Sequence, residues 1–359
     1  MAFYDVKGAP FRYRGAINVE DCETSEEVMK AANLDWTVAK CEIVAKMPAL
    51  NPDGLPVEGF IHGSNYYSEV PNAFATYRTD CDIPLGIVKE RYTPVQNIEA
   101  FKFFDGAIGK DKAIWQTAGY FGNGERIFVS AKLPKNIFVK GDPVDNYLVF
   151  TTSHDGTSGV KILFTPIRVV CQNTLNAAIK GSTNYVSFRH TSSVHSNLDI
   201  AAEILGICEQ RRVYLEHQFE ALSKIKVKDA DAQDVFASVI LTENEFDALS
   251  ATGHTVQQLI DRNYMAMQDA NISTKKMNAL GFMNDYYFNG PGQKEILGTG
   301  WGVYNAVTGY YSNVDNSVGT KRMDSLLFGD KSRKIQQAGD TILANEDFYM
   351  KEFSVQSGV

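Results

Sequence analysis

The chain has 359 residues, a mass of 39.8 kDa, 44% hydrophobic residues and a formal net charge of 35 − 43 = −8 at pH 7. This apolar content excludes a disordered chain and is enough for two domains, or for one large domain with an appendage. No apolar run approaches the roughly 20 residues that a membrane-spanning helix needs, and the N-terminus lacks the apolar segment of a secretory signal. We therefore expect no association with a membrane.

The cysteine pattern indicates a reducing compartment. The cysteines are odd in number and widely spaced, and no two of them form a C-x-x-C pair; they are Cys22, Cys41, Cys81, Cys171 and Cys208. A disulfide framework has denser and even-numbered cysteines. Reduced and mostly buried thiols are expected instead, which favours the cytoplasm, or the host cytoplasm if the chain is phage-encoded.

Residues 1–72 are predicted to form an N-terminal arm or cap. Thr24 followed by Ser25, Glu26 and Glu27 has the pattern of a helix N-cap with an acidic first turn. A strong turn signal follows at Asn51–Gly54. The apolar surface of this part is too small for it to fold alone.

Residues 73–228 are predicted to form an α+β core domain. Short β-rich runs alternate with turn signals, and the stretch Asn97–Ile108 has the apolar spacing of a helix. Two hairpins follow, closed by Asn-Gly and Asp-Gly turns. The expected strands are Phe74–Thr79, Leu85–Tyr92, Trp115–Phe121, Arg126–Leu133, Tyr147–Thr152 and Val160–Phe164. Together they predict one curved, mainly antiparallel sheet with helices packed on one face.

The second half of the core domain is expected to be more helical. A helix is predicted over Ile167–Ile179, followed by a short strand at Tyr185–Arg189. Apolar residues then recur at alternating spacings of three and four from Leu198 to Leu222, interrupted only by Arg212. This heptad spacing predicts a long helix packed across the back of the sheet, with Arg212 at an edge or in a contact between subunits.

The region 229–359 is predicted to be mostly helical. Asn289–Gly292 interrupts the helical pattern with a strong breaker signal. The candidate helices are Asp231–Leu241, Thr255–Gln268, Met277–Tyr287 and Gly300–Tyr311.

The charge is unevenly distributed along the chain. Residues 1–159 carry 16 basic and 21 acidic side chains (−5), residues 160–228 carry 9 and 5 (+4), and residues 229–359 carry 10 and 17 (−7). No acidic residue occurs from 157 to 198, a stretch that contains Lys161, Arg168, Lys180 and Arg189. Such a window in an acidic chain favours an anionic ligand. The alternative is an ordinary solvated face.

No strong catalytic or metal-binding motif is present. The chain lacks a P-loop and a G-x-S-x-G elbow, and the clustered glycines of Gly119–Gly124 fit a hairpin turn better than a nucleotide loop. His190 and His195 have a spacing that zinc ligands use, but without further ligands, anion contacts or loop hydrogen bonds are the simpler interpretation.

Two further candidates for chemistry are weak. Cys171 lies near the start of the helix expected after Arg168, where a thiol can become reactive, yet a buried structural cysteine is the commoner outcome. Asp80 and Asp82 fit a loop better than a carboxylate pair, because Pro84 ends the strand. We therefore expect no catalytic residue, no metal and no cofactor. An enzyme that uses Cys171 or a metal at the two histidines ranks last.

Three ordered motifs resemble a known family. They are Leu34-Asp35-Trp36-Thr-Val, Phe164-Thr-Pro-Ile-Arg168-Val-Val-Cys171-Gln172-Asn173-Thr174-Leu175 and Gly300-Trp301-Gly302-Val-Tyr304-Asn305-Ala-Val-Thr-Gly-Tyr310. Together they resemble the phage- and plasmid-borne family known as a domain of unknown function, or "phage/plasmid-like protein". This resemblance implies an origin in a mobile element and no particular activity.

A second resemblance concerns the expected core. A hairpin closed by Asp-Gly-Thr and followed by a helix with basic and amide residues is similar to the β-β-β-α core of ring-forming single-strand annealing recombination proteins. In that family, cations on the sheet and the helix line a groove for the DNA backbone. The resemblance implies nucleic-acid contacts from Arg168, Gln172, Asn173 and Lys180 on the helix and from Lys161 and Arg189 on adjoining strands.

These observations predict a non-enzymatic protein that binds single-stranded DNA and promotes strand annealing as a homo-oligomer. Annealing needs cations that follow the phosphates, and it needs no general base or nucleophile. The alternative is a non-enzymatic phage protein that binds a host or phage protein partner through its acidic C-terminal half.

Overall fold

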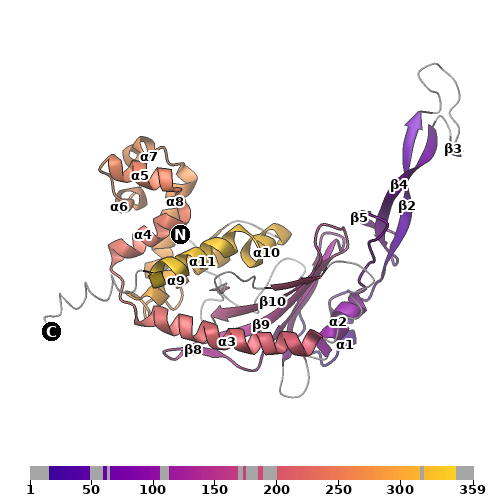
Figure 1. Cartoon of the computed structure of the whole chain (residues 1–359), viewed down its shortest axis with the longest axis horizontal. Helices are drawn as coiled ribbons and strands as arrows, with labels where there is room; N and C mark the ends of the chain where they lie inside the picture. Colours follow the sequence, from indigo (N-terminus) through magenta and orange to yellow (C-terminus); the bar gives the residue numbers. More distant parts are fainter. Residues whose placement is uncertain are drawn as a thin grey trace.

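The computed structural model describes residues 16–48, 60–62, 65–105, 113–168, 173–174, 185–188, 200–315 and 319–344. It shows an α+β protein with antiparallel sheets in the N-terminal half and a mostly helical C-terminal region, as predicted. A long β arm projects from one end of the molecule, a large sheet forms the middle, and most of the helices gather at the other end (Figure 1). No helix in the described ranges has the length and hydropathy to cross a membrane.

The arm is a small antiparallel sheet in the strand order β2-β4-β3, with β5 also paired to β4. Its strands are β2 (Val38–Pro48), β3 (Phe60–His62), β4 (Asn65–Arg78) and β5 (Pro84–Val88). Helix α1 (Ser25–Ala31) lies at the base of the arm, beside α2 (Asn97–Asp105) (Figure 1). The N-cap of α1 is Thr24, whose side chain accepts a hydrogen bond from the backbone N–H of Glu27, which confirms the predicted helix start.

The single sheet predicted for the core was wrong in one respect: β4 and β5 belong to the arm rather than to the main sheet. Residues 72 and 73, between which the boundary of the N-terminal arm or cap was expected, lie within β4. Pro71 and Asn72, with a φ of 56° at Asn72, have the appearance of a strand break. In the structure they lie in a bulge of β4. Glu42 pairs with Phe74 and Val44 pairs with Glu69, so residues 70–73 of β4 lie opposite Ile43 alone.

The main sheet follows the order β1-β6-β7-β9-β10-β11, with β12 also paired to β10 and β8 to β9. Both predicted hairpins are confirmed by their registers, in which β6 pairs with β7 and β9 with β10. The strands are β1 (Ile17–Asn18), β6 (Ile114–Phe121), β7 (Arg126–Lys132), β8 (Ile137–Val139), β9 (Asp142–Ser153), β10 (Val160–Arg168), β11 (Asn173–Thr174) and β12 (Tyr185–Phe188).

The helix predicted over Ile167–Ile179 was wrong at each of its described residues. Strand β10 continues to Arg168, and Asn173–Thr174 pairs back onto it, with Arg168 opposite Asn173. The β-branched residues Ile167, Val169 and Val170 in this stretch favour an extended backbone over a helix.

The helical elements agree more closely with the sequence. They are α2 (Asn97–Asp105), α3 (Ile200–Lys224), α4 (Asp229–Ile240), α5 (Glu243–Ala251), α6 (Val256–Ile260), α7 (Tyr264–Asp269), α8 (Thr274–Asn289), α9 (Gly300–Gly309), the π-helical turn η2 (Tyr310–Val314), α10 (Gly319–Leu327) and α11 (Asp330–Ala344). The helix expected over Thr255–Gln268 is split in two, because Arg262 adopts a φ of 62° and Asn263 caps α7.

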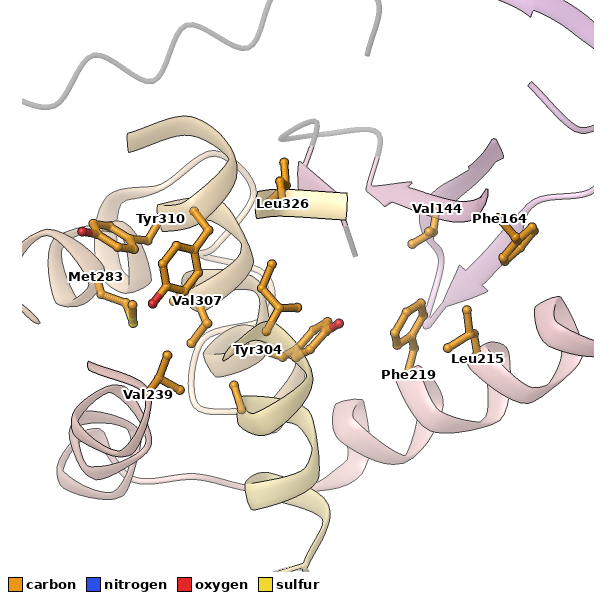
Figure 2. Close-up of a cluster of buried hydrophobic side chains, with 14 of the residues drawn as sticks. Val144, Phe164, Leu215, Phe219, Val239, Met283, Tyr304, Val307, Tyr310 and Leu326 are labelled. Atoms are coloured by element: carbon orange, nitrogen blue, oxygen red, sulfur yellow. The ribbon is translucent and has the colours of Figure 1, made fainter. Parts of the chain in front are cut away.

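The long helix α3 lies along the main sheet, as its heptad spacing predicted (Figure 1). Its apolar residues Leu215 and Phe219 are buried and point toward Val144 and Phe164 of the sheet (Figure 2). Arg212 instead bonds Glu209 and Glu216 on its own helix. The opposite face of the sheet carries a second, smaller apolar cluster that Leu327 of α10 completes.

Helix α9 packs so closely against α8 that one position requires glycine. A Cβ at Gly309 would lie 2.2 Å from two ring atoms of Tyr286, which is fully buried. We expect Gly309→Ala to lower the free energy of unfolding by about 1–3 kcal/mol, measured by urea denaturation. Gly281→Ala is the control, because the nearest atom to its Cβ would be the Ile260 carbonyl oxygen at 3.8 Å. In the helix α8 this change should be neutral or stabilising by up to about 1 kcal/mol; equal losses in both variants would refute the close packing.

Candidate functional site

A cavity of about 630 Å³ lies where the end of the main sheet meets the helical region. Its lining comes from the turn between β8 and β9, the end of β10, the chain after α3 and the segment that leads into α9. The charged residues of this lining are Lys140, Asp142, Arg168, Lys226 and Glu295. Three of them are cations and two are carboxylates, which gives a formal charge of +1 for the part of the lining that the structure describes.

A buried ion pair forms the inner wall of the cavity. The Arg168 side chain is 2% exposed, and its Nε donates to Oδ2 of Asp142 at 2.5 Å. The same oxygen accepts a hydrogen bond from Nε1 of Trp301 at 3.0 Å, and a second guanidinium nitrogen of Arg168 donates to the Gly292 carbonyl at 2.9 Å. Arg168 therefore ties the sheet to the helical region.

Local backbone geometry places the two lysines at the rim. Lys140 and Gly141 form a two-residue hairpin turn with φ values of 51° and 89°, the combination that a type I′ turn requires. The Lys140 ammonium donates to the Ser223 carbonyl of α3 at 2.7 Å. Lys226 is held by a β-bridge to Thr299, flanked by hydrogen bonds from Val227 N–H to Gly298 and from Gly300 N–H to Ile225.

Two stretches that are far apart in the sequence meet at this cavity. Arg168 belongs to the motif 164–175 and Trp301 to the motif 300–310, and both bond Asp142. Trp36, from the motif 34–38, lies elsewhere. Its ring packs against Arg78, with 4.4 Å between the guanidinium carbon and the ring centroid, and against His154. The two motifs were the signal in the sequence for this cavity. Sequence reasoning did not show that they meet, because their common partner, Asp142, belongs to neither motif.

Of the three described candidates for nucleic-acid contact, the structure brings Arg168 and Asn173 together and places Lys161 apart from them. Lys161 and Arg168 both lie on β10, seven residues apart, which is about 23 Å along a strand. Since the separation is odd, their side chains point to opposite faces of the sheet. Asn173 lies on β11 beside Arg168. Gln172, Lys180 and Arg189 lie outside the described residues.

Lys161 is partly buried on the face away from α3. Its ammonium lies 4.6 Å from the centroid of the Phe328 ring. Burial lowers the pKa of Lys161, the nearby Asp324 opposes this change, and Arg126 adds to it. Asp324 itself forms an ion pair with Arg126. Lys161 therefore takes part in packing between the sheet and the segment after α10.

The described candidates for chemistry have structural roles. Asp80 pairs with Arg78 at 2.7 Å, which lowers the pKa of its carboxyl group, and Asp82 lies in the turn before β5, so the loop interpretation is confirmed. Burial raises the pKa of the Cys208 thiol to about 12. Cys171, His190 and His195 lie outside the described residues. Within those residues, no group of three or more His, Cys, Asp and Glu side chains could hold a metal ion.

The cavity lies within the part of the chain that matches a known protein family. No curated protein and no solved structure matches the chain. A family match covers residues 84–341, which include every residue of the cavity lining and leave Trp36 and the strands β2, β3 and β4 outside. Because this match spans well over half of the sequence, the chain belongs to the family described as "Domain of unknown function (DUF932)".

Proposed function

We propose that this protein, of phage or plasmid origin, binds single-stranded DNA without catalysing a reaction and promotes strand annealing as a homo-oligomer. The observation that carries the proposal is the convergence of Lys140 and Lys226 at the rim of one cavity, from a hairpin turn and from the chain after α3. Because Asp142 neutralises Arg168 in the wall, these two lysines provide the charge for an anionic ligand.

The lysines continue along the surface next to the cavity. In Lys224-Ile225-Lys226-Val227-Lys228, the two apolar side chains are buried and Lys224 and Lys226 are exposed. Lys224 pairs with Glu220 at 2.8 Å, and both side chains are about half exposed. Exposed ion pairs of this kind stabilise a protein little, so a phosphate can replace the carboxylate at small cost.

A short row of cations fits a backbone ligand better than a base-specific one. Phosphate contacts fix a strand without reading its sequence, and they leave the bases free to pair with a second strand. Within the described residues, the lining of the cavity contains no cysteine and no histidine, the residue types that most often act as a nucleophile and its base.

The proposal predicts opposite effects for two substitutions at the rim. Lys226→Ala should weaken binding of a labelled oligothymidylate roughly fivefold at low salt, because one phosphate contact is lost. Glu295→Gln should strengthen it, because Glu295 is exposed at the same rim and repels phosphate. Fluorescence anisotropy measures both affinities.

Lys275→Ala is the matched control, because Lys275 is an exposed lysine on α8 and is not part of the cavity lining. Its effect should be less than twofold. Equal losses at Lys226 and Lys275 would show nonspecific attraction, and no binding by the wild-type protein at low salt would reject the function.

A second candidate function is binding to a host or phage protein. The observation that favours it is the exposure of Tyr264 and Met265 at the start of α7, at 55% and 64%, within the acidic region 229–359. Co-purification from host lysate separates the two functions: a stoichiometric protein partner that is lost in Met265→Ser supports this candidate, and nuclease-sensitive recovery of DNA supports the first.

A further inference from the structure

Strand β2 forms one edge of the arm, and no other described strand lies next to it there. In the order β2-β4-β3, strand β2 is terminal, and within the described residues it pairs only with β4. The arm projects away from the main sheet and from the helices, so neither covers this edge (Figure 1). Unpaired edge strands are templates for pairing with another chain.

The backbone groups of this edge can be assigned from the base of the arm. The N–H and C=O of Val38 bond the side chain of Gln96, at 2.9 and 3.0 Å, instead of β4. Successive residues of a strand direct these groups to opposite edges. The N–H and C=O groups of Lys40 and Glu42 therefore point to the open edge. At the bulge the additional residues belong to β4, and exposure alternates along β2 without a break from Glu42 to Lys46. The groups of Val44 and Lys46 thus continue the same alternation, and beyond the base no described element covers them.

The side chains along this edge are suited to a partner. Glu42, Val44 and Lys46 occupy every second position of β2 and therefore lie on the same face, where all three are exposed, Val44 at 52%. Met47, near the end of the strand, is 43% exposed. At Val44 and Ala45 the described part of the arm is only two strands wide, because β3 and β5 pair with β4 on either side of this point. A two-stranded ribbon with an exposed apolar surface is marginally stable in water, so a further strand would stabilise it there.

We propose that β2 pairs antiparallel with β2 of a second copy of this chain, centred on Val44. In this register Val44 faces Val44, and Glu42 of each copy faces Lys46 of the other. Opposite charges directly across a ladder are favourable. A two-fold axis makes the contact self-complementary and closes it as a dimer. The interface is separate from the cavity and needs no DNA.

Three neighbouring symmetric registers are less favourable. Two residues that face each other across an antiparallel ladder both direct their N–H and C=O groups toward the partner strand, or both direct them away from it. The two-fold axis therefore passes between two copies of the same residue. Centring on Ile43 places Lys40 opposite Lys46 twice, and centring on Glu42 places two carboxylates face to face. Centring on Cys41 requires the edge groups of Val38, which Gln96 already occupies.

A charge exchange tests the contact on the full chain in the absence of DNA. Sedimentation velocity should show a concentration-dependent dimer. Glu42→Lys or Lys46→Glu alone should weaken it about tenfold or more, because each creates two like-charge pairs. The double variant Glu42→Lys/Lys46→Glu should restore it to within about threefold. A wild-type monomer up to roughly 100 µM, or a double variant no better than the single ones, would overturn the proposal.

Crosslinking tests the register independently of the charge variants. In the centred register the Cα atoms of the two Val44 residues lie about 5.5 Å apart, within reach of a disulfide. Val44→Cys in a Cys41→Ser background should therefore give an interchain disulfide on mild oxidation, and Cys41→Ser alone should not. Crosslinking through the native Cys41, or through neither residue, would contradict this register. Loss of DNA binding with an intact dimer would reject the proposed function and leave this interface in place.

Discussion

Replacement of Arg168 by alanine is expected to lower the free energy of unfolding by about 3–5 kcal/mol, the usual cost of leaving one partner of a buried ion pair without its counter-charge. Arg168 is 2% exposed and bonds both Asp142 and the Gly292 carbonyl. Among the described residues, its removal leaves Trp301 as the side chain that is still bonded to the Asp142 carboxylate. Urea denaturation followed by tryptophan fluorescence measures the loss.

Removing the charge of Asp142 tests whether the loss of stability in Arg168→Ala comes from the unpaired carboxylate. Adding Asp142→Asn to Arg168→Ala removes the unpaired carboxylate and should recover at least 1 kcal/mol. Arg333→Ala is the control, because Arg333 and its partner Asp330 are 77% and 65% exposed and an exposed pair contributes about 0–1 kcal/mol. A loss below about 1 kcal/mol in Arg168→Ala would contradict the buried network.

A substitution of Arg168 is a poor test of DNA binding, because it also disturbs the fold. Weaker binding by Arg168→Ala would report a disturbed junction between the sheet and the helices, because the side chain is bonded within the protein. Lys226 is exposed and lines the same cavity. Its substitution tests the contact without opening the junction.

The second large effect is expected from Phe219→Ala, which should cost about 3–5 kcal/mol of unfolding free energy. Phe219 is fully buried, and its ring centroid lies 4.9 Å from that of Trp301 and 6.0 Å from that of Tyr304. From α3 it reaches both the sheet and α9 (Figure 2). Truncation leaves a cavity at the contact between the two halves of the molecule.

The neighbouring His217→Ala is the control for Phe219→Ala, since His217 is exposed on the same helix. Its effect should stay within about 0.5 kcal/mol. Comparable losses in the two variants would mean that helix propensity, rather than packing against Trp301 and Tyr304, accounts for the effect.

The sequence predicted best the elements that local signals determine. The Asn-Gly turn at Asn123 and the Asp-Gly turn at Asp155 defined both hairpins of the main sheet, and the heptad spacing defined α3. Each of these signals is complete within one short segment.

The sequence predicted less well what depends on partners distant in the chain. The strand predicted from Phe74 begins at Asn65 in the structure, because β2 pairs with β4 on both sides of the bulge at Pro71 and Asn72. Arg168 was expected on a helix, in contact with nucleic acid; its internal partners could not be foreseen, since Asp142 is 26 residues earlier and Gly292 is 124 residues later. Likewise, nothing local shows that Lys140 and Lys226 share a cavity.

The salt dependence of oligothymidylate binding tests the central claim most directly. For a single strand, the slope of log K against log salt concentration is about −0.7 for each phosphate neutralised. We predict that Lys140→Ala/Lys226→Ala makes the slope of the wild-type protein shallower by about 1.4, whereas the Lys275→Ala control leaves it unchanged. A double variant with the wild-type slope, or a wild-type affinity that does not change with salt, would contradict the assignment of DNA binding to this cavity.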